Sequence, residues 1–348
     1  MDDLKPMGPP TTVISAEHAL NIANSFDTII DVRSPAEFID DHIPGSINLP
    51  VLNDQQRADI GGIYKKISPF TAKRTGAALV AQNIAIHLQT ILKNKARNWR
   101  PLIYCWRGGQ RSNAMAQIFS NIGWHCSVVD GGYKAYRRHV LNRLDTIASE
   151  VFLIILAGQT GTAKTHILQE VKKKGAQIVD LEQLACHRGS LLGSNPDIVQ
   201  PTQRLFESKI FSTLTNLDLQ KKIFIEAESN KIGNVHVPDG LWSAMRSAAS
   251  IRVVAPMAAR VNFLKRDYAH MIKNSELIMP LLLKLKHRQN ASQLATWQRL
   301  IKKKDWDQLI ESLLIHHYPS LDHFLSLKYG EHYSLTPDLQ RLLFQIAH

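Results

Sequence analysis

The sequence predicts two α/β domains in series, each a parallel sheet covered by helices, followed by a helical C-terminal segment. Three observations predict this order. Over residues 12–140, short apolar runs alternate with longer helix-like stretches, the rhythm of a parallel sheet. A second such series begins at residue 151, and beyond Arg260 strand signals end while apolar residues recur at helical intervals. The length of 348 residues suits two domains and an extension, at roughly 100 to 200 residues per domain.

The first series has strand candidates at residues 28–32, 102–104 and 127–129. A helix should begin after Ser34, because Ser34 can cap it, Pro35 suits the first helical position and Glu37 can complete a capping box. The preceding strand therefore ends at Val32 or Arg33.

The second series has strand candidates at residues 151–156, 177–180, 222–227 and 251–255. Residues 137–150 have helical spacing and no Gly or Pro, which predicts a connecting helix in place of a flexible linker. Helical spacing returns over residues 281–301 and 306–325. We expect a first domain over 1–140, a connecting helix over 141–150, a second domain over 151–260 and a helical subdomain over 261–348.

The amino-acid composition limits the classes of protein to which the chain can belong. A hydrophobic fraction of 44% and a charged fraction of 21% are ordinary for a folded, soluble chain. Three cysteines cannot form a disulfide framework and favour a reducing compartment. The acidic start is unlike a signal peptide, and the apolar runs fall short of the roughly 18 residues of a membrane span, so we expect a cytoplasmic protein without a membrane partner. The net charge of +12 is shared between residues 1–140 and 141–348 and favours a polyanionic partner over a localised basic tail.

Cys105 lies between a short strand and a helix-like stretch that runs to residue 122. It opens the loop Cys105-Trp106-Arg107-Gly108-Gly109-Gln110-Arg111-Ser112. Two glycines allow the amides to turn inward, the helix adds its positive end, and Arg107 and Arg111 add charge, all of which favour a thiolate. The alternative is a buried cysteine that simply ends a strand; Cys126 and Cys186 lack such surroundings and are interpreted as core or surface thiols.

These residues resemble the rhodanese family, whose active cysteine lies in such a loop and carries a persulfide. Residues 31–38 and 42–50 resemble the two N-terminal signatures of that family, and residues 130–132 resemble its closing turn. The resemblance covers about residues 12–140 and implies site roles for Asp31, Arg33, Trp106, Gly108 and Gly109 beside Cys105. From the cysteine to the Arg-Ser pair, this loop is one residue longer than in common sulfurtransferases, which leaves room for a larger atom or a different acceptor.

A second loop follows the strand at 151–156 and precedes a helix. Its sequence is Gly158-Gln159-Thr160-Gly161-Thr162-Ala163-Lys164-Thr165. In this P-loop context, typical of the P-loop NTPases, amides wrap a diphosphate, Lys164 reaches phosphate oxygens and Thr165 can hold a metal ion. Ala163 stands where the template has glycine, so its methyl is expected to crowd the phosphate or restrict the backbone.

Polar residues gather after the other strands of this domain, at the rim where open parallel sheets bind ligands. Glu226 and Glu228 share one face of their strand, where many P-loop proteins hold magnesium. Magnesium is therefore compatible with the sequence, although no metal-ligand set is identified and each residue is otherwise interpretable as a cap or a surface group. The candidates are Asp180, Glu182, His187, Arg188, Gly189, Ser190, Gln200, Glu226, Glu228 and Ser229.

The order of these motifs along the chain resembles the bacterial tRNA 2-selenouridine synthase family. That resemblance implies exchange of sulfur for selenium in wobble 2-thiouridine of tRNA, with selenophosphate and geranyl diphosphate as co-substrates and an S-geranyl intermediate. It implies no tightly bound cofactor, and an enzyme that supplies selenophosphate is compatible as a partner. In this interpretation, Gly158, Gly161, Thr162, Ala163, Lys164 and Thr165 bind the diphosphate, and Cys105 with Arg107 and Arg111 serves the selenium step.

Three alternatives remain open at this point. They are a rhodanese fused to an ATP-dependent kinase or ATPase, a thiosulfate sulfurtransferase that would leave residues 150–348 unexplained, and a non-enzymatic tRNA-binding scaffold. Candidate tRNA contacts are Lys284, Lys286, Arg288 and Lys302–Lys304 beside Trp306. The sequence leaves the oligomeric state open.

Overall fold

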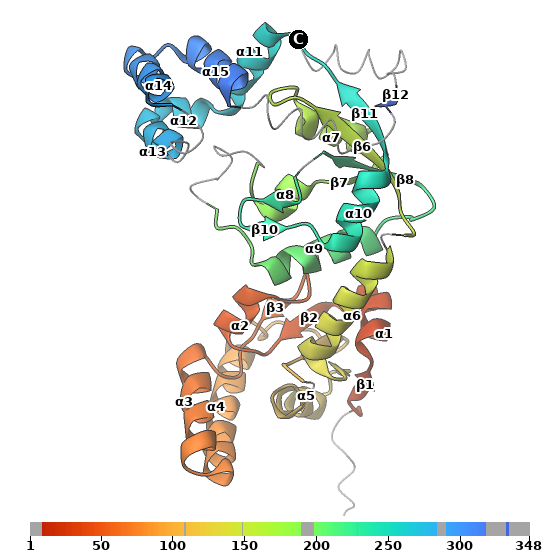
Figure 1. Cartoon of the computed structure of the whole chain (residues 1–348). Coiled ribbons are helices and arrows are strands. Elements are labelled where there is room, and N and C mark those ends of the chain that lie inside the picture. Colours follow the sequence, from red (N-terminus) through yellow and green to blue (C-terminus); the bar gives the residue numbers. More distant parts are fainter. Residues whose placement is uncertain are drawn as a thin grey trace, which may run out of the picture. The chain divides into compact units, whose positions relative to one another are not determined.

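A computed structural model describes residues 9–107, 109–147, 149–188, 198–227, 229–283, 290–317 and 332–333. The chain forms two compact units (Figure 1). The first contains Met1–Arg143 with Glu207–Lys209, and the second contains Leu144–Phe206 and Ile210–His348.

The first unit is built on a parallel sheet of five strands in the order β1-β5-β4-β2-β3. The strands are β1 (Thr12–Ile14), β2 (Thr28–Asp31), β3 (Ile47–Asn48), β4 (Pro101–Tyr104) and β5 (Ser127–Val129). The helices are α1 (Ala16–Asn21), η1 (Ala23–Ser25), α2 (Pro35–Asp40), α3 (Asp54–Lys66), α4 (Pro69–Gln89), α5 (Gln110–Ile122) and α6 (Gly132–Ile147). The three predicted strands are present, and β4 lies at the centre with all four residues buried, as its continuous apolar sequence favours.

Helix α2 begins where the sequence predicts, because the backbone N–H of Ser34 donates to Glu37 Oε2 at 3.1 Å. The core beneath the sheet gathers Ile30, Ile103, Phe119 and Trp124, each of which contributes roughly 1.5–3 kcal/mol by burial. In the sequence, helices α3 and α4 come between β3 and β4. They pack against one another as an antiparallel hairpin (Figure 1).

The second unit has a parallel sheet in the order β12-β11-β6-β8-β7. Its strands are β6 (Phe152–Gly158), β7 (Gln177–Val179), β8 (Lys222–Glu226), β11 (Ala249–Val253) and β12 (His332–Tyr333), with a separate antiparallel pair of β9 (Lys231–Ile232) and β10 (Val235–His236). The helices of this part of the chain are α7 (Lys164–Lys173), α8 (Leu181–Ala185), α9 (Gln203–Thr215), α10 (Asp239–Ser247), α11 (Met257–Asp267), α12 (Ala269–Lys273), η2 (Ser275–Leu277), α13 (Ile278–Leu283), α14 (Ala291–Lys303) and α15 (Trp306–His316).

The fold class predicted from the sequence is confirmed, with local corrections. The helix expected over 137–150 starts earlier, at Gly132, and ends at Ile147. Strand β11 begins two residues before the apolar run at 251, and β12 returns to the sheet from a segment predicted to be wholly helical. Two paired residues are too few to show the alternation that identifies a strand in sequence.

Helices α11 to α15 enclose a small core of their own. Trp297 is fully buried there, and its indole N–H donates to Ser312 Oγ at 2.9 Å, so its polar atom is satisfied. None of the helices in the described ranges combines the length and apolar character needed to cross a bilayer.

Candidate functional site

The first candidate site is the loop between β4 and α5, which holds Cys105. The thiol is 4% exposed, and its Sγ accepts hydrogen bonds from the backbone N–H of Gly109 and from Ser112 Oγ, both at 3.3 Å. Because Gly109 is the N-cap of α5, the sulfur lies at the positive end of a 13-residue helix. The loop therefore surrounds the sulfur with donors that favour negative charge.

Burial opposes ionisation of the Cys105 thiol, but hydrogen bonds outweigh it and lower its pKa. The donors are the Ser112 hydroxyl and the backbone N–H groups of Ser112, Arg107 and Gly109. Cys126 lies in the apolar core without such donors, and burial raises its pKa to about 12. Of these two thiols, only Cys105 has surroundings that favour the thiolate.

The two arginines of the loop are placed differently from each other. Arg111 donates from Nη1 to Glu37 Oε2 at 2.9 Å, and this ion pair outweighs burial and lowers the pKa of Glu37. Arg107 is exposed and contributes its backbone N–H to the thiolate. The described hydrogen-bond donors to the sulfur are amides and Ser112, a residue that the sequence analysis did not single out, and the effect of the two guanidinium groups on the thiolate stays a prediction.

Asp31 and Arg33 form a buried brace behind the loop. Arg33 Nη2 lies 2.6 Å from Asp31 Oδ2 and 2.6 Å from the carbonyl oxygen of Asp41, and its guanidinium stacks 4.0 Å from the Tyr133 ring centroid. The backbone N–H of Tyr133 in turn donates to the Cys105 carbonyl at 2.8 Å. Arg33, paired with Asp31, therefore packs against Tyr133, the residue that supports the loop. Neither Asp31 nor Arg33 has a described contact with the sulfur.

Trp106 completes the exposed part of this loop. Its ring is 36% exposed and lies 5.2 Å from the Tyr133 ring. Gly108, also predicted for this site, lies outside the described residues.

The second candidate site is the loop between β6 and α7. Gly158 is required by close approach, since a Cβ there would lie 2.8 Å from both the Val253 carbonyl oxygen and Thr162 Oγ1. Gly161 has φ of +85°, a conformation that favours glycine. Lys164 opens α7, and its Nζ lies 2.9 Å from the Gly158 carbonyl oxygen, so its ammonium lies over the loop.

Ala163 adopts the left-handed conformation, with φ of 60° and ψ of 30°. Such a conformation costs a residue with a Cβ roughly 1–2 kcal/mol, which explains why glycine is the usual occupant. The methyl restricts the backbone as the sequence predicts, yet the loop still takes the turn that leads into the helix.

Two carboxylates converge on the hydroxyl of Thr165. Its Oγ1 lies 3.0 Å from Glu182 Oε2 and 3.2 Å from Glu226 Oε2, and the Glu182 N–H donates to Glu226 Oε1 at 2.9 Å. A hydroxyl with one or two carboxylates next to a phosphate loop is a donor set that suits Mg²⁺. The described ranges contain no cluster of three His, Cys, Asp or Glu residues that could hold a metal ion.

Other predicted residues of this unit serve the fold. Asp180 caps α8 through the N–H of Gln183 and accepts from Gln169, and Gln200 donates to the carbonyls of Ala185 and Ile232. Through these hydrogen bonds, each of the two side chains links separate segments of the unit.

Three further predictions concern the segments after α8 and β8. Arg188 pairs with Asp267 at 2.8 Å, burial lowers the pKa of His187, and Ser229 Oγ donates to the Lys231 carbonyl. Gly189, Ser190 and Glu228 lie outside the described residues, as do Lys284, Lys286 and Arg288. Lys302–Lys304 are exposed at the end of α14.

Arg260 on α11 is a site residue that the sequence analysis missed. It is 4% exposed, its Nε donates to the Thr160 carbonyl at 2.8 Å and its Nη1 donates to Gln159 Oε1 at 2.9 Å. The one signal in the sequence is that Arg260, a charged residue, lies on the inner side of an otherwise apolar helical pattern. Arg260 ties the C-terminal helices to the phosphate loop.

An apolar pocket begins at the phosphate loop. Thr160 forms one part of its wall, and the remaining wall comes from α11, α12, α13 and α15. The wall contains Thr160, Leu264, Tyr268, Met271, Ile272, Ile278, Trp306, Leu309, Ile310, Leu313 and Leu314. The unit thus places a hydrocarbon-lined space next to a loop suited to phosphate.

Two family models match successive parts of the chain. A rhodanese-like family model matches residues 15–139, and a model described as the tRNA 2-selenouridine synthase AAA domain matches residues 151–313. The first match confirms the rhodanese resemblance of the N-terminal half.

Several curated relatives share both halves. The tRNA 2-selenouridine synthase of Shewanella oneidensis is 30% identical over 360 residues, covering 97% of this chain and 94% of that protein. That of Bdellovibrio bacteriovorus is 32% identical, covering 73% and 68%. That of Nitrosomonas europaea is 34% identical, covering 72% of this chain and 65% of the relative, so the chain aligns with slightly less than two thirds of that protein.

Proposed function

Since the chain belongs to the tRNA 2-selenouridine synthase family, we propose that it exchanges sulfur for selenium at wobble 2-thiouridine of tRNA. The proposed route uses geranyl diphosphate to alkylate the sulfur and selenophosphate to supply selenium. A thiocarbonyl sulfur is a poor leaving group, whereas an alkylated sulfur leaves as a thiolate.

The observation that carries the geranyl step is the apolar pocket that begins at Thr160. A prenyl diphosphate has an anionic head and a hydrocarbon tail, and the second unit offers a phosphate loop and an apolar wall in direct succession. In this step the thiocarbonyl sulfur attacks C1 of the geranyl group, the C–O bond breaks and diphosphate leaves. Lys164 and the loop amides stabilise the charge that develops on the departing oxygen.

Thr165, Glu182 and Glu226 are the residues that would hold magnesium. A magnesium ion bound there would neutralise charge on the diphosphate. Arg260 supports the same loop by fixing the Thr160 carbonyl and the Gln159 side chain.

Cys105 serves the selenium step in this proposal. Its lowered pKa favours the thiolate, the nucleophilic form, over the thiol, and Trp106 and Arg107 form the exposed rim of its loop. The selenium of selenophosphate attacks C2 of the alkylated uridine, the C2–S bond breaks and the geranyl thiolate leaves and takes up a proton. Water then cleaves the P–Se bond, so that phosphate is released and 2-selenouridine remains.

Mass spectrometry of wobble nucleosides tests the proposal, with tRNA from cells that have or lack this protein. We expect both 2-selenouridine and S-geranyl-2-thiouridine to disappear in its absence and to return with the wild-type chain. Unchanged amounts of both would contradict the proposal and favour a scaffold or an unrelated sulfurtransferase.

Affinity measurements test the pocket separately. Burial of a prenyl tail should make geranyl diphosphate bind at least about tenfold more tightly than inorganic diphosphate, since each buried methylene contributes roughly 0.8 kcal/mol. Equal affinities would show that the pocket takes no prenyl chain.

A further inference from the structure

Positive charge that neither candidate site uses is concentrated in residues 60–100, which include the second half of α3, all of α4 and the segment that follows α4 up to β4. Residues 60–100 contain eight Lys or Arg residues and no Asp or Glu, a net charge of +8. The other residues among the first 140 contain eight Lys or Arg and eleven Asp or Glu, a net charge of −3. The basic excess of the first unit therefore comes from this one segment.

The tip of the hairpin, defined as residues 64–74, combines charge with exposed apolar surface. Tyr64 is 55% exposed, Ile67 is 73% exposed and Phe70 is 71% exposed. Lys65, Lys66, Lys73 and Arg74 are exposed around them. Three large apolar side chains that are exposed within seven residues of each other indicate an interaction site.

These apolar side chains are not needed to join the two helices. The seam of the hairpin lies elsewhere, where Gly76 faces Ile60 closely enough that a Cβ would lie 3.6 Å from the Ile60 side chain. On α4 the buried residues are Ala72, Gly76 and Ile84. Tyr64, Ile67 and Phe70 are thus available to a partner.

The cations of the tip are also available within the described structure. Among the ion pairs of the described residues, none involves Lys65, Lys66, Lys73 or Arg74. The acids of α3 are engaged elsewhere: Asp54 accepts from the Ala36 N–H and Asp59 accepts from Gln55. A polyanion with unstacked bases fits this surface, because phosphates pair with the cations and bases stack on the aromatic rings.

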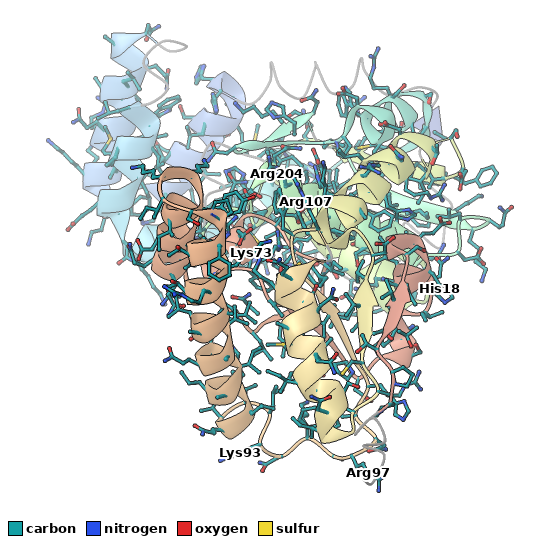
Figure 2. The ribbon with its side chains drawn as sticks, turned by 90° about the horizontal axis from the view of Figure 1, so that it is seen from below. His18, Lys73, Lys93, Arg97, Arg107 and Arg204 are labelled. Carbon is teal, nitrogen blue, oxygen red and sulfur yellow. The ribbon has the colours of Figure 1, made fainter. Side chains whose placement is uncertain are left out.

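The tip also lies on the side of the unit that carries the Cys105 loop. Figure 2 shows Lys73 and Arg107 toward one end of the first unit and Lys93 and Arg97 toward the opposite end. Lys73 is separated from the end of α4 at Gln89 by roughly 24 Å along the helix axis. A nucleic-acid strand bound at the tip would therefore lie at the same end of the unit as Arg107 of the sulfur loop, whereas one bound near Lys93 would lie at the opposite end.

We propose that the hairpin tip binds tRNA, with Lys65, Lys66, Lys73 and Arg74 on phosphates and Tyr64 or Phe70 against an unstacked base. This rests on the proposed function, which makes tRNA the substrate. The tip is a docking surface and takes no part in the chemical steps.

The test compares two double variants with equal loss of charge, Lys73→Ala with Arg74→Ala and Lys93→Ala with Arg97→Ala. Binding of unmodified substrate tRNA by the full chain is measured over a range of salt concentrations. Losing two phosphate contacts should reduce the slope of log affinity against log salt by about 1.4–1.8 and weaken binding roughly 10- to 30-fold at 0.15 M salt. The control pair should change affinity less than about twofold.

A second comparison separates stacking from charge. Phe70→Ala should weaken tRNA binding roughly fivefold or more without changing the salt slope, because stacking on an aromatic ring involves no counterion release. Ile91→Ala, which removes a side chain that is 57% exposed beyond α4, is the matched control. Circular dichroism verifies that all four variants are folded.

The outcomes distinguish this proposal from the proposed function. If wild type modifies tRNA and the tip variants bind like their controls, the docking proposal is wrong and the function stands. If the tip variants lose binding to vesicles of anionic lipid but keep their affinity for tRNA, the tip is a membrane surface and the proposal also fails. If wild type neither binds nor modifies tRNA, both proposals fall.

Discussion

The Cys105 loop and the phosphate loop have the same local construction and treat negative charge differently. Each follows a buried strand, contains two glycines and leads into the N-terminus of a helix. In the first, donors from Gly109 and Ser112 already converge on a sulfur that belongs to the protein. In the second, Lys164 Nζ lies 2.9 Å from the Gly158 carbonyl oxygen, and the negative charge proposed for this loop belongs to the phosphates of a ligand. Under the proposed function, the same strand-loop-helix design stabilises a resident nucleophile in the first unit and a departing group in the second.

Removal of the Cys105 thiol should have the largest effect. Cys105→Ala should abolish selenium incorporation and leave geranylation of thiolated tRNA largely intact, because the thiol serves only the second step. Nucleoside mass spectrometry after incubation with each co-substrate measures both products. Cys126→Ala, which removes a thiol whose pKa burial raises to about 12, is the control. Normal 2-selenouridine from Cys105→Ala would overturn this assignment.

Loss of the Lys164 ammonium should be the next largest effect. Lys164→Ala should slow geranyl transfer about a hundredfold or more, since removing one charged donor to a leaving group typically costs on the order of 3 kcal/mol. Single-turnover rates with geranyl diphosphate measure the change. Lys172→Ala removes an exposed lysine at the other end of α7 and should leave the rate unchanged. A similar loss in both variants would point to a general charge effect.

Ser112→Ala tests the electrostatics of the first loop. The Ser112 hydroxyl opposes the effect of burial and lowers the pKa of Cys105, so its removal should raise that pKa. Alkylation by iodoacetamide should then slow near pH 7 and recover as the pH rises. Ser120→Ala, which removes another buried hydroxyl of α5, should keep the wild-type pH profile. An unchanged profile in Ser112→Ala would mean that the amides alone set the reactivity.

Ala163→Gly should have the smallest effect and the opposite sign. Release of a left-handed alanine saves roughly 1–2 kcal/mol, while glycine costs about 0.5–1 kcal/mol in chain entropy. The free energy of unfolding should therefore rise by up to about 1.5 kcal/mol, as measured in urea. Ala176→Gly, at a position without positive φ, should instead destabilise the chain by about 0.4–1 kcal/mol. Equal destabilisation by both substitutions would show that Ala163 is not strained.

The local parts of both sites could be predicted from sequence, because strand, glycine loop and helix start lie within about ten residues of each other. The same holds for the cap at Ser34. Contacts between distant segments could not, since nothing in the local pattern connects Arg111 to Glu37 or Arg260 to Thr160. Ser112 was missed for a related reason: a serine on the first turn of a helix has no signal that separates a surface group from a thiolate partner. The apolar pocket required four helices to be placed together, which periodicity cannot provide.

The division of labour between the two loops is tested most directly by giving Lys164→Ala two different substrates. With 2-thiouridine tRNA, geranyl diphosphate and selenophosphate, the variant should form very little 2-selenouridine. With tRNA that already carries S-geranyl-2-thiouridine, it should form 2-selenouridine at close to the wild-type rate, because the later step depends on Cys105. Equal impairment on both substrates would contradict the account and show that the phosphate loop also serves the selenium step.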